Sequence, residues 1–148
     1  MSSEPQNRIG RSHAVVLHRA LLGGLVVCIV LFAFLLYAGI APFSLDLASG
    51  PVGVWTVATA PLVPLVLGWL LMRTNVPGRP SSLPAERYWA ETDAGRHAFV
   101  AWVLWEMAAL LGFVGVLISG ASPPAITGLL AFLLLLLHGP SYVEERSV

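Results

Sequence analysis

Apolar residues gather in four runs along the chain, separated by short segments that hold almost all of the polar residues. Three of the runs cover 20–41, 52–72 and 98–118. The first two contain no charged residue, and the third contains only Glu106. Each of these is long enough to span a membrane, because about 20 apolar residues cross the bilayer hydrocarbon. The fourth run reaches that length only as 122–138, with its interfacial ends included. The pattern predicts four transmembrane helices, with three spans and a re-entrant last segment as the alternative.

Composition assigns the whole chain to the membrane class. Eight basic and eight acidic residues carry charge among 148, 57% of residues are hydrophobic, and the mean hydropathy is +0.80. A soluble domain has about twice that charged fraction, and disordered chains and nucleic-acid binders need the charge that is missing here. We therefore predict an all-α protein, a four-helix transmembrane bundle. Its one membrane domain covers 20–138, between tails at 1–19 and 139–148.

The distribution of positive charge predicts an orientation. All basic residues are arginines, and with four spans each falls on the side of the N-terminus: Arg8, Arg11, Arg19, Arg73, Arg79, Arg87, Arg96 and Arg146. Cytoplasmic loops carry the positive excess, so both termini and the 73–97 loop are expected to be cytoplasmic. The absence of Lys beside abundant Ala, Gly and Arg is typical of a GC-rich bacterial gene. The expected location is therefore a bacterial plasma (inner) membrane.

The 73–97 loop is the one sizeable polar segment between spans. Its first part, 75–84, is rich in Pro, Gly and Ser and is expected to be irregular. Residues 85–91 are expected to form a short interfacial helix that turns Tyr88 and Trp89 toward the bilayer. The acidic residues of the loop and tail are expected to be solvated; they are Glu86, Glu91, Asp93, Glu144 and Glu145.

Glu106 is the main candidate for chemistry, because it lies close to the middle of the third span. A charge at that depth costs at least about 2.5 to 3.5 kcal/mol, so a carboxyl there is paired, hydrated or protonated. No arginine or histidine occurs at the same depth in another span, which favours the protonated form. Trp102 precedes Glu106 by one helical turn, and its indole N–H is a candidate donor to the carboxyl.

The second span offers further candidate partners for this acid. Pro61 and Pro64 fall at its middle, and each removes the helical donor of a carbonyl four residues earlier. Such a free carbonyl, or the hydroxyl of Thr59, is a candidate contact for Glu106. Three roles stay open for this carboxyl: a hydrogen-bonded peg that fixes helix register, a contact with a partner subunit, or proton or cation exchange.

Small residues predict where helices pack closely. Ala108, Gly112 and Gly115 share one face of the third span, and Glu106 lies on nearly the opposite face with Trp102 and Phe113. Small faces let neighbouring helix backbones approach in a membrane. Gly23 and Gly24 are expected to serve the same purpose in the first span, and Gly128 in the fourth.

Evidence for a cofactor or catalysis is weak. His18, His97 and His138 all fall at the cytoplasmic ends of spans, which makes them weak candidates for a metal or haem site. Their spacing is unspecific, since histidine is common at membrane interfaces. The chain carries no nucleophile elbow, phosphate loop or zinc-protease motif. We therefore expect no cofactor, no metal and no enzymatic activity.

One stretch resembles a known family. Residues 105–119, WEMAALLGFVGVLIS, look like the carboxylate-bearing helix of the proteolipid c subunits of rotary ATP synthases. The second span, a loop with Arg73, Arg79 and Pro80, and the third span follow the order of that helical hairpin. The resemblance implies that Glu106 is an ion-carrying carboxylate. The chain departs from the family in its midhelix prolines, its longer loop and its two additional spans.

The sequence as a whole favours a small multi-pass membrane protein that serves as a non-enzymatic accessory or structural subunit of a membrane complex. Expected partners are the lipid bilayer and other membrane subunits or further copies of the chain, and no nucleic acid. Proton or cation translocation through Glu106 is the alternative function. A haem or quinone membrane anchor is the second alternative.

Overall fold

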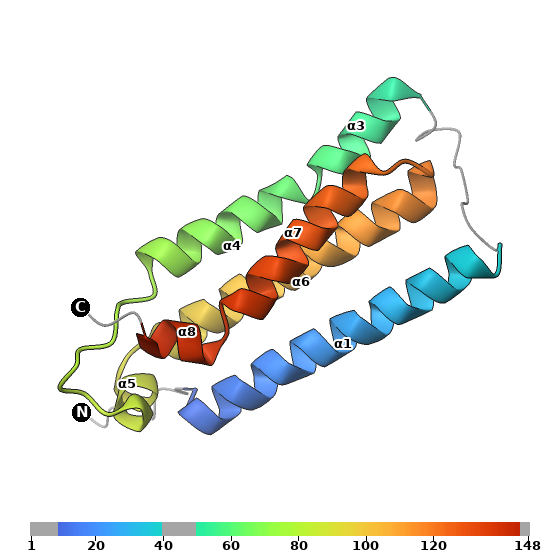
Figure 1. The fold of residues 1–148 in the computed structure, drawn as a ribbon. Helices are drawn as coiled ribbons and strands as arrows, with labels where there is room; N and C mark the ends of the chain where they lie inside the picture. The colour runs from blue at the N-terminus through green and yellow to red at the C-terminus, as the bar shows by residue number, and fades with distance from the viewer. Residues whose placement is uncertain (1–8, 40–49, 146–148) are drawn as a thin grey trace, which may run out of the picture.

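The computed structural model describes residues 9–39 and 50–145, which form helices and no strand. Three segments are long and apolar enough to cross a membrane, while α7 is a shorter apolar helix. In chain order the helices are α1 (Arg11–Tyr37), α3 (Pro51–Thr59), α4 (Leu62–Thr74), α5 (Ala85–Glu91), α6 (Ala94–Ser119), α7 (Pro123–Leu137) and α8 (Pro140–Glu145) (Figure 1). The all-helical class is therefore confirmed, and the three long apolar segments support membrane association.

The helices extend beyond the apolar runs that predicted them. α1 begins at Arg11, so most of the described part of the expected tail 1–19 is helical, and residues 40–41 of the first expected span lie outside the described residues. α6 begins at Ala94, four residues before its apolar run. The expected tail at 139–148 likewise contains α8. Hydropathy marks the part of a helix that matches the hydrocarbon, and the backbone continues its hydrogen bonding past that limit.

The second span is interrupted where its prolines predicted. α3 ends at Thr59 and α4 begins at Leu62, with Pro61 between them (Figure 1). Proline has no N–H to donate and its ring crowds the preceding turn, which breaks the helix. Because of the break, α3 contacts both α6 and α7, whereas α4 packs on α6.

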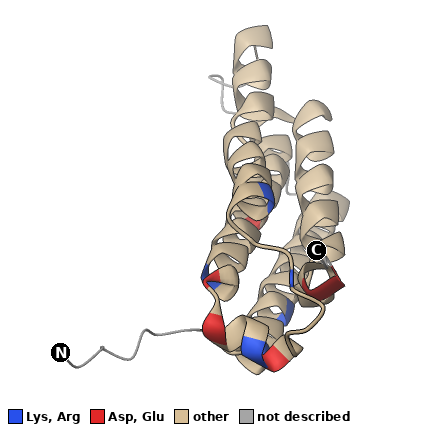
Figure 2. Ribbon diagram, turned by 90° about the vertical axis from the view of Figure 1, so that its left-hand side faces the viewer, with Lys and Arg blue, Asp and Glu red and all other residues tan. Residues whose placement is uncertain are grey.

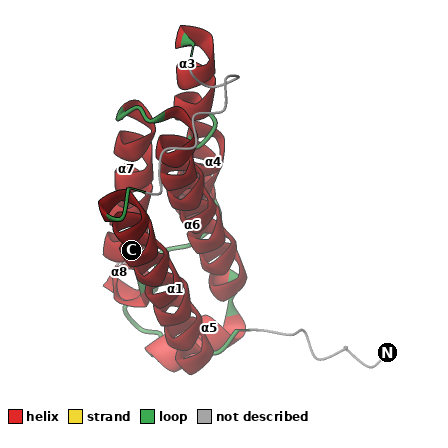
Figure 3. Cartoon of the chain, turned by 90° about the vertical axis from the view of Figure 1, so that its right-hand side faces the viewer, coloured by secondary structure: helices red, strands yellow, loops and turns green. Residues whose placement is uncertain are grey.

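α6 is the central helix, with α7 beside it (Figure 3). The two helices run antiparallel (Figure 1). A Cβ added to Gly112 would lie 2.5 Å from the Cα of Gly128, and one added to Gly115 would lie 2.9 Å from the side chain of Pro124. These distances leave no room for a methyl group, so the two backbones are in direct contact. The predicted packing role of this face is confirmed.

α1 lies along the opposite side of α6 and runs parallel to it. The His18 ring contacts the Trp102 ring with centroids 4.8 Å apart, and about four turns further along α1 the Phe32 and Phe113 rings are 5.7 Å apart. Most of the remaining surface of α1 is exposed and apolar, including Val26, Val27, Val30, Leu31 and Phe34. Along most of its length α1 therefore meets the bundle through α6, and its first turns also contact α5 and α8.

Charged residues gather at the end of the bundle formed by the start of α1, α5 and α8, which we call the arginine-bearing end (Figure 2). Behind this polar surface lies an aromatic core in which Trp89, Trp102 and Trp105 are completely buried. Tyr88 is also fully buried, and its hydroxyl donates to the carbonyl of Pro77. The expected short helix therefore exists, but Tyr88 and Trp89 point into the protein and not toward the bilayer.

Candidate functional site

Glu106 lies close to the midpoint of α6 and faces α1. A Cβ added to Gly24 would lie 3.8 Å from Oε1 of Glu106. We call this line of contacts the α1–α6 seam; it consists of His18, Gly24 and Phe32 in α1 and Trp102, Glu106 and Phe113 in α6. The carboxyl thus lies between two aromatic contacts, opposite a residue without a side chain. The expected grouping of Glu106 with Trp102 and Phe113 is confirmed.

The Glu106 carboxyl makes no hydrogen bond and no ion pair with any residue that the structure describes. Its expected donor has another partner, because Nε1 of Trp102 donates to the carbonyl of His138 at 2.7 Å. That carbonyl follows the last turn of α7, where the ending helix supplies no donor of its own. The indole therefore joins α6 to the end of α7, and the expectation that it holds Glu106 is wrong.

The interrupted second span also contacts a different residue of α6. Pro61 and Pro64 are buried, but the donor that reaches this region is Nε1 of Trp105, which hydrogen-bonds the carbonyl of Leu65 at 3.2 Å. A Cβ on Gly68 would lie 2.8 Å from the same indole nitrogen, so Gly68 makes the space for that ring. Adjacent positions on a helix point about 100° apart, and α4 therefore meets Trp105 while Glu106 faces α1.

Thr59 does not reach Glu106 either. Its hydroxyl donates to the carbonyl of Trp55 at 2.8 Å, which is a bond within its own helix and is typical of threonine near a helix end.

The small residues proposed for helix packing divide into two groups. Ala108, Gly112 and Gly115 are buried, and Gly24 faces the Glu106 carboxyl. Gly23, in contrast, has nothing within 4 Å of the position a Cβ would take. Gly23 therefore packs against no helix of the described chain, because the next residue, Gly24, points toward α6 and turns Gly23 away from it.

The three histidines form no metal site in the described part of the chain, where no group of three or more His, Cys, Asp or Glu side chains is placed to hold an ion. Nε2 of His18 is 2.8 Å from the carbonyl of Leu135, and Nδ1 of His138 is 3.1 Å from that of Leu134. Nδ1 of His97 is buried and has no hydrogen-bond partner among the described residues. Two of the three rings thus bind backbone carbonyls near the end of α7.

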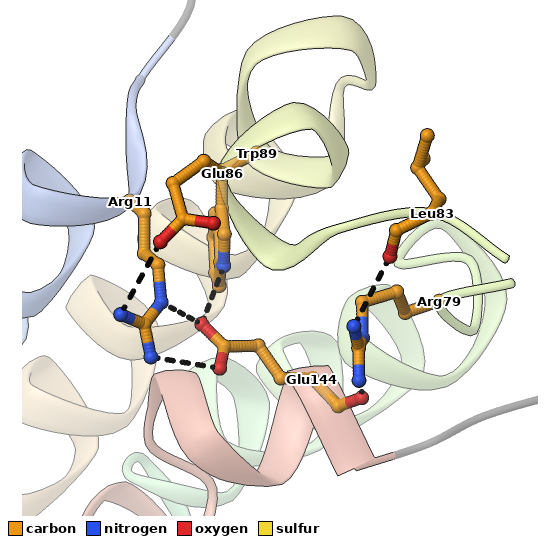
Figure 4. Close-up of polar contacts among 6 residues, drawn as sticks. All are labelled: Arg11, Arg79, Leu83, Glu86, Trp89 and Glu144. Atoms are coloured by element: carbon orange, nitrogen blue, oxygen red, sulfur yellow. Dashed lines mark hydrogen bonds and ion pairs between the residues drawn. The ribbon is translucent and has the colours of Figure 1, made fainter. Parts of the chain in front are cut away.

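The polar network at the arginine-bearing end centres on Glu144, which sequence patterns assign to solvent. Arg11 donates from Nε to Oε1 of Glu144 at 2.7 Å and from Nη2 to Oε2 at 3.1 Å (Figure 4). Nε1 of Trp89 donates to the same Oε1 at 2.9 Å, and Nε of Arg79 donates to the Glu144 backbone carbonyl at 3.0 Å. One residue of α8 therefore ties together α1, α5 and the loop between α4 and α5.

The environment of Glu144 favours its charged form. Hydrogen bonding from Arg11 holds the pKa of the Glu144 carboxyl below its usual range, and partial burial opposes this shift. The indole N–H of Trp89 lowers the pKa further. Only 13% of the Glu144 side chain is exposed, so the expectation of a solvated tail residue is wrong. The sequence gives no signal for this network, because its ionic partners are 133 positions apart and follow no periodic pattern.

Comparison of the chain with family models, curated proteins and solved structures finds no match. Glu144 has its hydrogen-bonding capacity met within the chain, which fits a structural contact. The Glu106 carboxyl has no hydrogen-bond partner among the described residues, although an unpaired carboxyl costs more free energy at the middle of an apolar helix than at the polar end of the bundle.

Proposed function

We propose that this protein is a non-enzymatic accessory or structural subunit of a larger membrane assembly. In the proposed assembly, Glu106 contacts a hydrogen-bond donor or a cation on a helix of another subunit. The observation that carries the proposal is the Glu106 carboxyl itself, which faces the α1–α6 seam with no bonding partner among the described residues. A polar group at that depth is costly until it is paired, so a partner that pairs it gains binding energy.

The surroundings of Glu106 support a contact from outside the chain. Glu106 is only partly buried, and Gly24 opposite it adds no side chain that would cover the carboxyl. Close approach of a further helix is easiest where a glycine lies on the surface. The exposed apolar surface of α1 beside it suits either lipid or the helix of another subunit.

We further propose that the chain crosses a bacterial inner membrane four times with both termini in the cytoplasm. The hydrogen bonds between Arg11 and Glu144 support an even number of crossings, since they join the start of α1 to α8. α7 has 15 residues, about 22 Å of helix, which is short for the hydrocarbon layer. Local thinning of the bilayer or its interfacial ends would make up the difference.

The test is purification of the tagged protein from its own membrane in mild detergent, followed by native mass spectrometry. We expect a heteromeric complex of defined stoichiometry. Glu106→Leu should weaken it by about 1 to 2 kcal/mol, a factor of roughly 5 to 30 in the dissociation constant. Glu106→Gln retains hydrogen bonding without charge, so a strong loss with Gln identifies a cation as the partner group.

A matched control is Met107→Leu, which introduces the same side chain at the neighbouring exposed position of α6. This variant should purify with the full complex. The proposal fails if the wild-type protein is isolated repeatedly as a monomer, or if Glu106→Leu leaves the complex intact.

The alternative function is proton or cation translocation through Glu106, supported by the position of the carboxyl at the middle of α6. In proteoliposomes, flux that is present in the wild type and lost in a folded Glu106→Gln variant would favour it. The haem or quinone anchor makes a different prediction, because haem bound at His18 or His138 gives a Soret band in the purified protein.

A further inference from the structure

A crevice of about 330 Å³ opens between α1 and the segment that joins α7 to α8 at the arginine-bearing end. Its polar lining includes Arg19, His18 and Ser141, and its apolar lining includes Val15, Leu22 and Leu136. From Arg11 at its outer limit to Leu22, α1 rises by about 16 Å, since each residue adds about 1.5 Å. The crevice therefore extends from the polar surface of the protein into its membrane-spanning part.

The two arginines of the crevice differ in their hydrogen bonds and ion pairs. Arg11 is held by two hydrogen bonds to Glu144, and its Nη1 is 3.7 Å from Oε1 of Glu86. Arg19 is exposed and makes no hydrogen bond or ion pair with any part of the chain that the structure describes. Because Glu144 is occupied by Arg11 and Trp89, the crevice retains one unbalanced guanidinium.

We propose that this crevice binds the phosphate of an anionic membrane phospholipid. The Arg19 guanidinium donates to the phosphate oxygens, and the Ser141 hydroxyl lies in the same crevice as a further donor. A planar guanidinium is suited to this, because it can donate two parallel hydrogen bonds to one phosphate. The acyl chains follow the apolar wall at Leu22 and Leu136.

Two observations favour an anionic phospholipid over other phosphate-bearing ligands. The apolar wall that continues from the head-group end favours a phospholipid over free phosphate, which has no apolar part to bury. The carboxylate of Glu144 is already paired, so an ammonium group of a zwitterionic lipid finds no free acceptor of opposite charge there. Phosphatidylglycerol fits both conditions, since its head group carries one negative charge and no ammonium.

Binding is measured by native mass spectrometry of the delipidated full-length protein titrated with phosphatidylglycerol. We expect Arg19→Gln to raise the dissociation constant about tenfold, as loss of a charge-assisted hydrogen bond at a partly exposed site implies. Arg96→Gln is the matched control, because Arg96 is also exposed, near the start of α6, and does not line the crevice. This control should bind within about twofold of the wild type.

A second variant, Ser141→Trp, fills the crevice without changing its charge and should weaken binding by a similar factor. Far-ultraviolet circular dichroism checks that each variant keeps its helices. The proposal is overturned if Arg19→Gln and Arg96→Gln weaken binding equally, which would indicate general surface electrostatics. It is also overturned if phosphatidylcholine binds as tightly, or if free glycerol phosphate competes as well as the lipid.

Discussion

At the contact between α6 and α7, single glycines decide how closely two helix backbones approach. A Cβ on Gly112 would meet the backbone nitrogen of Gly128 at 2.6 Å and the carbonyl of Pro124 at 2.7 Å. Backbone atoms cannot rotate away as a flexible side chain does, so the helices would have to separate. Dispersion contacts between the two helices fall off steeply with such a separation.

Gly112→Ala is therefore expected to destabilise the protein by about 1 to 3 kcal/mol through overpacking. Thermal unfolding in detergent, followed by loss of helical circular dichroism, measures this change. Gly23→Ala is the matched control, because a Cβ there meets nothing within 4 Å. Its stability should be unchanged or slightly higher, since alanine is the better helix former. Equal losses in the two variants would contradict the assigned contact.

Glu106 and Trp102 indicate how far residue-level prediction reaches. The grouping of the two on one face follows from helical periodicity alone, and it is correct. The partner of the Trp102 indole is not predictable in that way, because the carbonyl of His138 comes from a helix 36 positions later in the chain. Local spacing determines which side chains share a face, while tertiary packing determines which atoms bond.

At the scale of elements, α8 is short, and its contacts are what hold it in place. It has six residues, fewer than an isolated helix needs, so its stability depends on tertiary contacts. Val143 is fully buried, and Glu144 binds Arg11 and Trp89. The position of α8 is therefore linked to the charge of one carboxylate.

This link predicts a dependence on pH. Because the pKa of Glu144 is lowered in the folded protein, its ionised form stabilises the fold above the unfolded pKa of about 4.3. That stabilisation is lost as the pH falls through the folded value. At pH 7, Glu144→Gln should unfold more easily than the wild type by about 1 kcal/mol, and the difference should vanish in strong acid.

Hydrogen exchange of the α8 amides across this pH range provides the local measurement, and thermal unfolding the global one. Glu145→Gln is the control, since Glu145 is the exposed neighbour on the same helix. A difference between wild type and Glu144→Gln that persists unchanged at pH 2 would mean that the contact does not require charge.

The positions of the helices were largely predictable from the sequence. The residues at which they end and their tertiary contacts were not. Apolar runs predict the spans, and Pro61 predicts the break between α3 and α4. The burial of Tyr88 and Trp89 escapes prediction, because an amphipathic helix of seven residues can turn its apolar face to lipid or to protein. The chain supplies a protein surface there through α1, α6 and Glu144 of α8, and both α1 and α8 lie far from α5 in sequence.

At the scale of the whole molecule, the start of α1 and the end of α8 meet. The 2.7 Å hydrogen bond between Arg11 and Glu144 requires both to be on one side of any membrane that the bundle crosses. Reporter fusions test this directly: a fluorescent protein that matures only in the cytoplasm should report from either terminus. Alkaline phosphatase, which is active only outside, should be silent at both. Opposite signals from the two termini would indicate three crossings and contradict this arrangement.

The contact between Arg11 and Glu144 also forms only after a delay during synthesis of the chain. These residues are separated by 133 positions, and a ribosome that adds about 5 to 20 residues per second needs roughly 7 to 27 s to make the second after the first. During that interval α1 has been made, but the carboxylate that binds its Arg11 has not. A chain cut before Glu144 lacks these hydrogen bonds, so its α1 is held only by the contacts with α5, α6 and the last turn of α7.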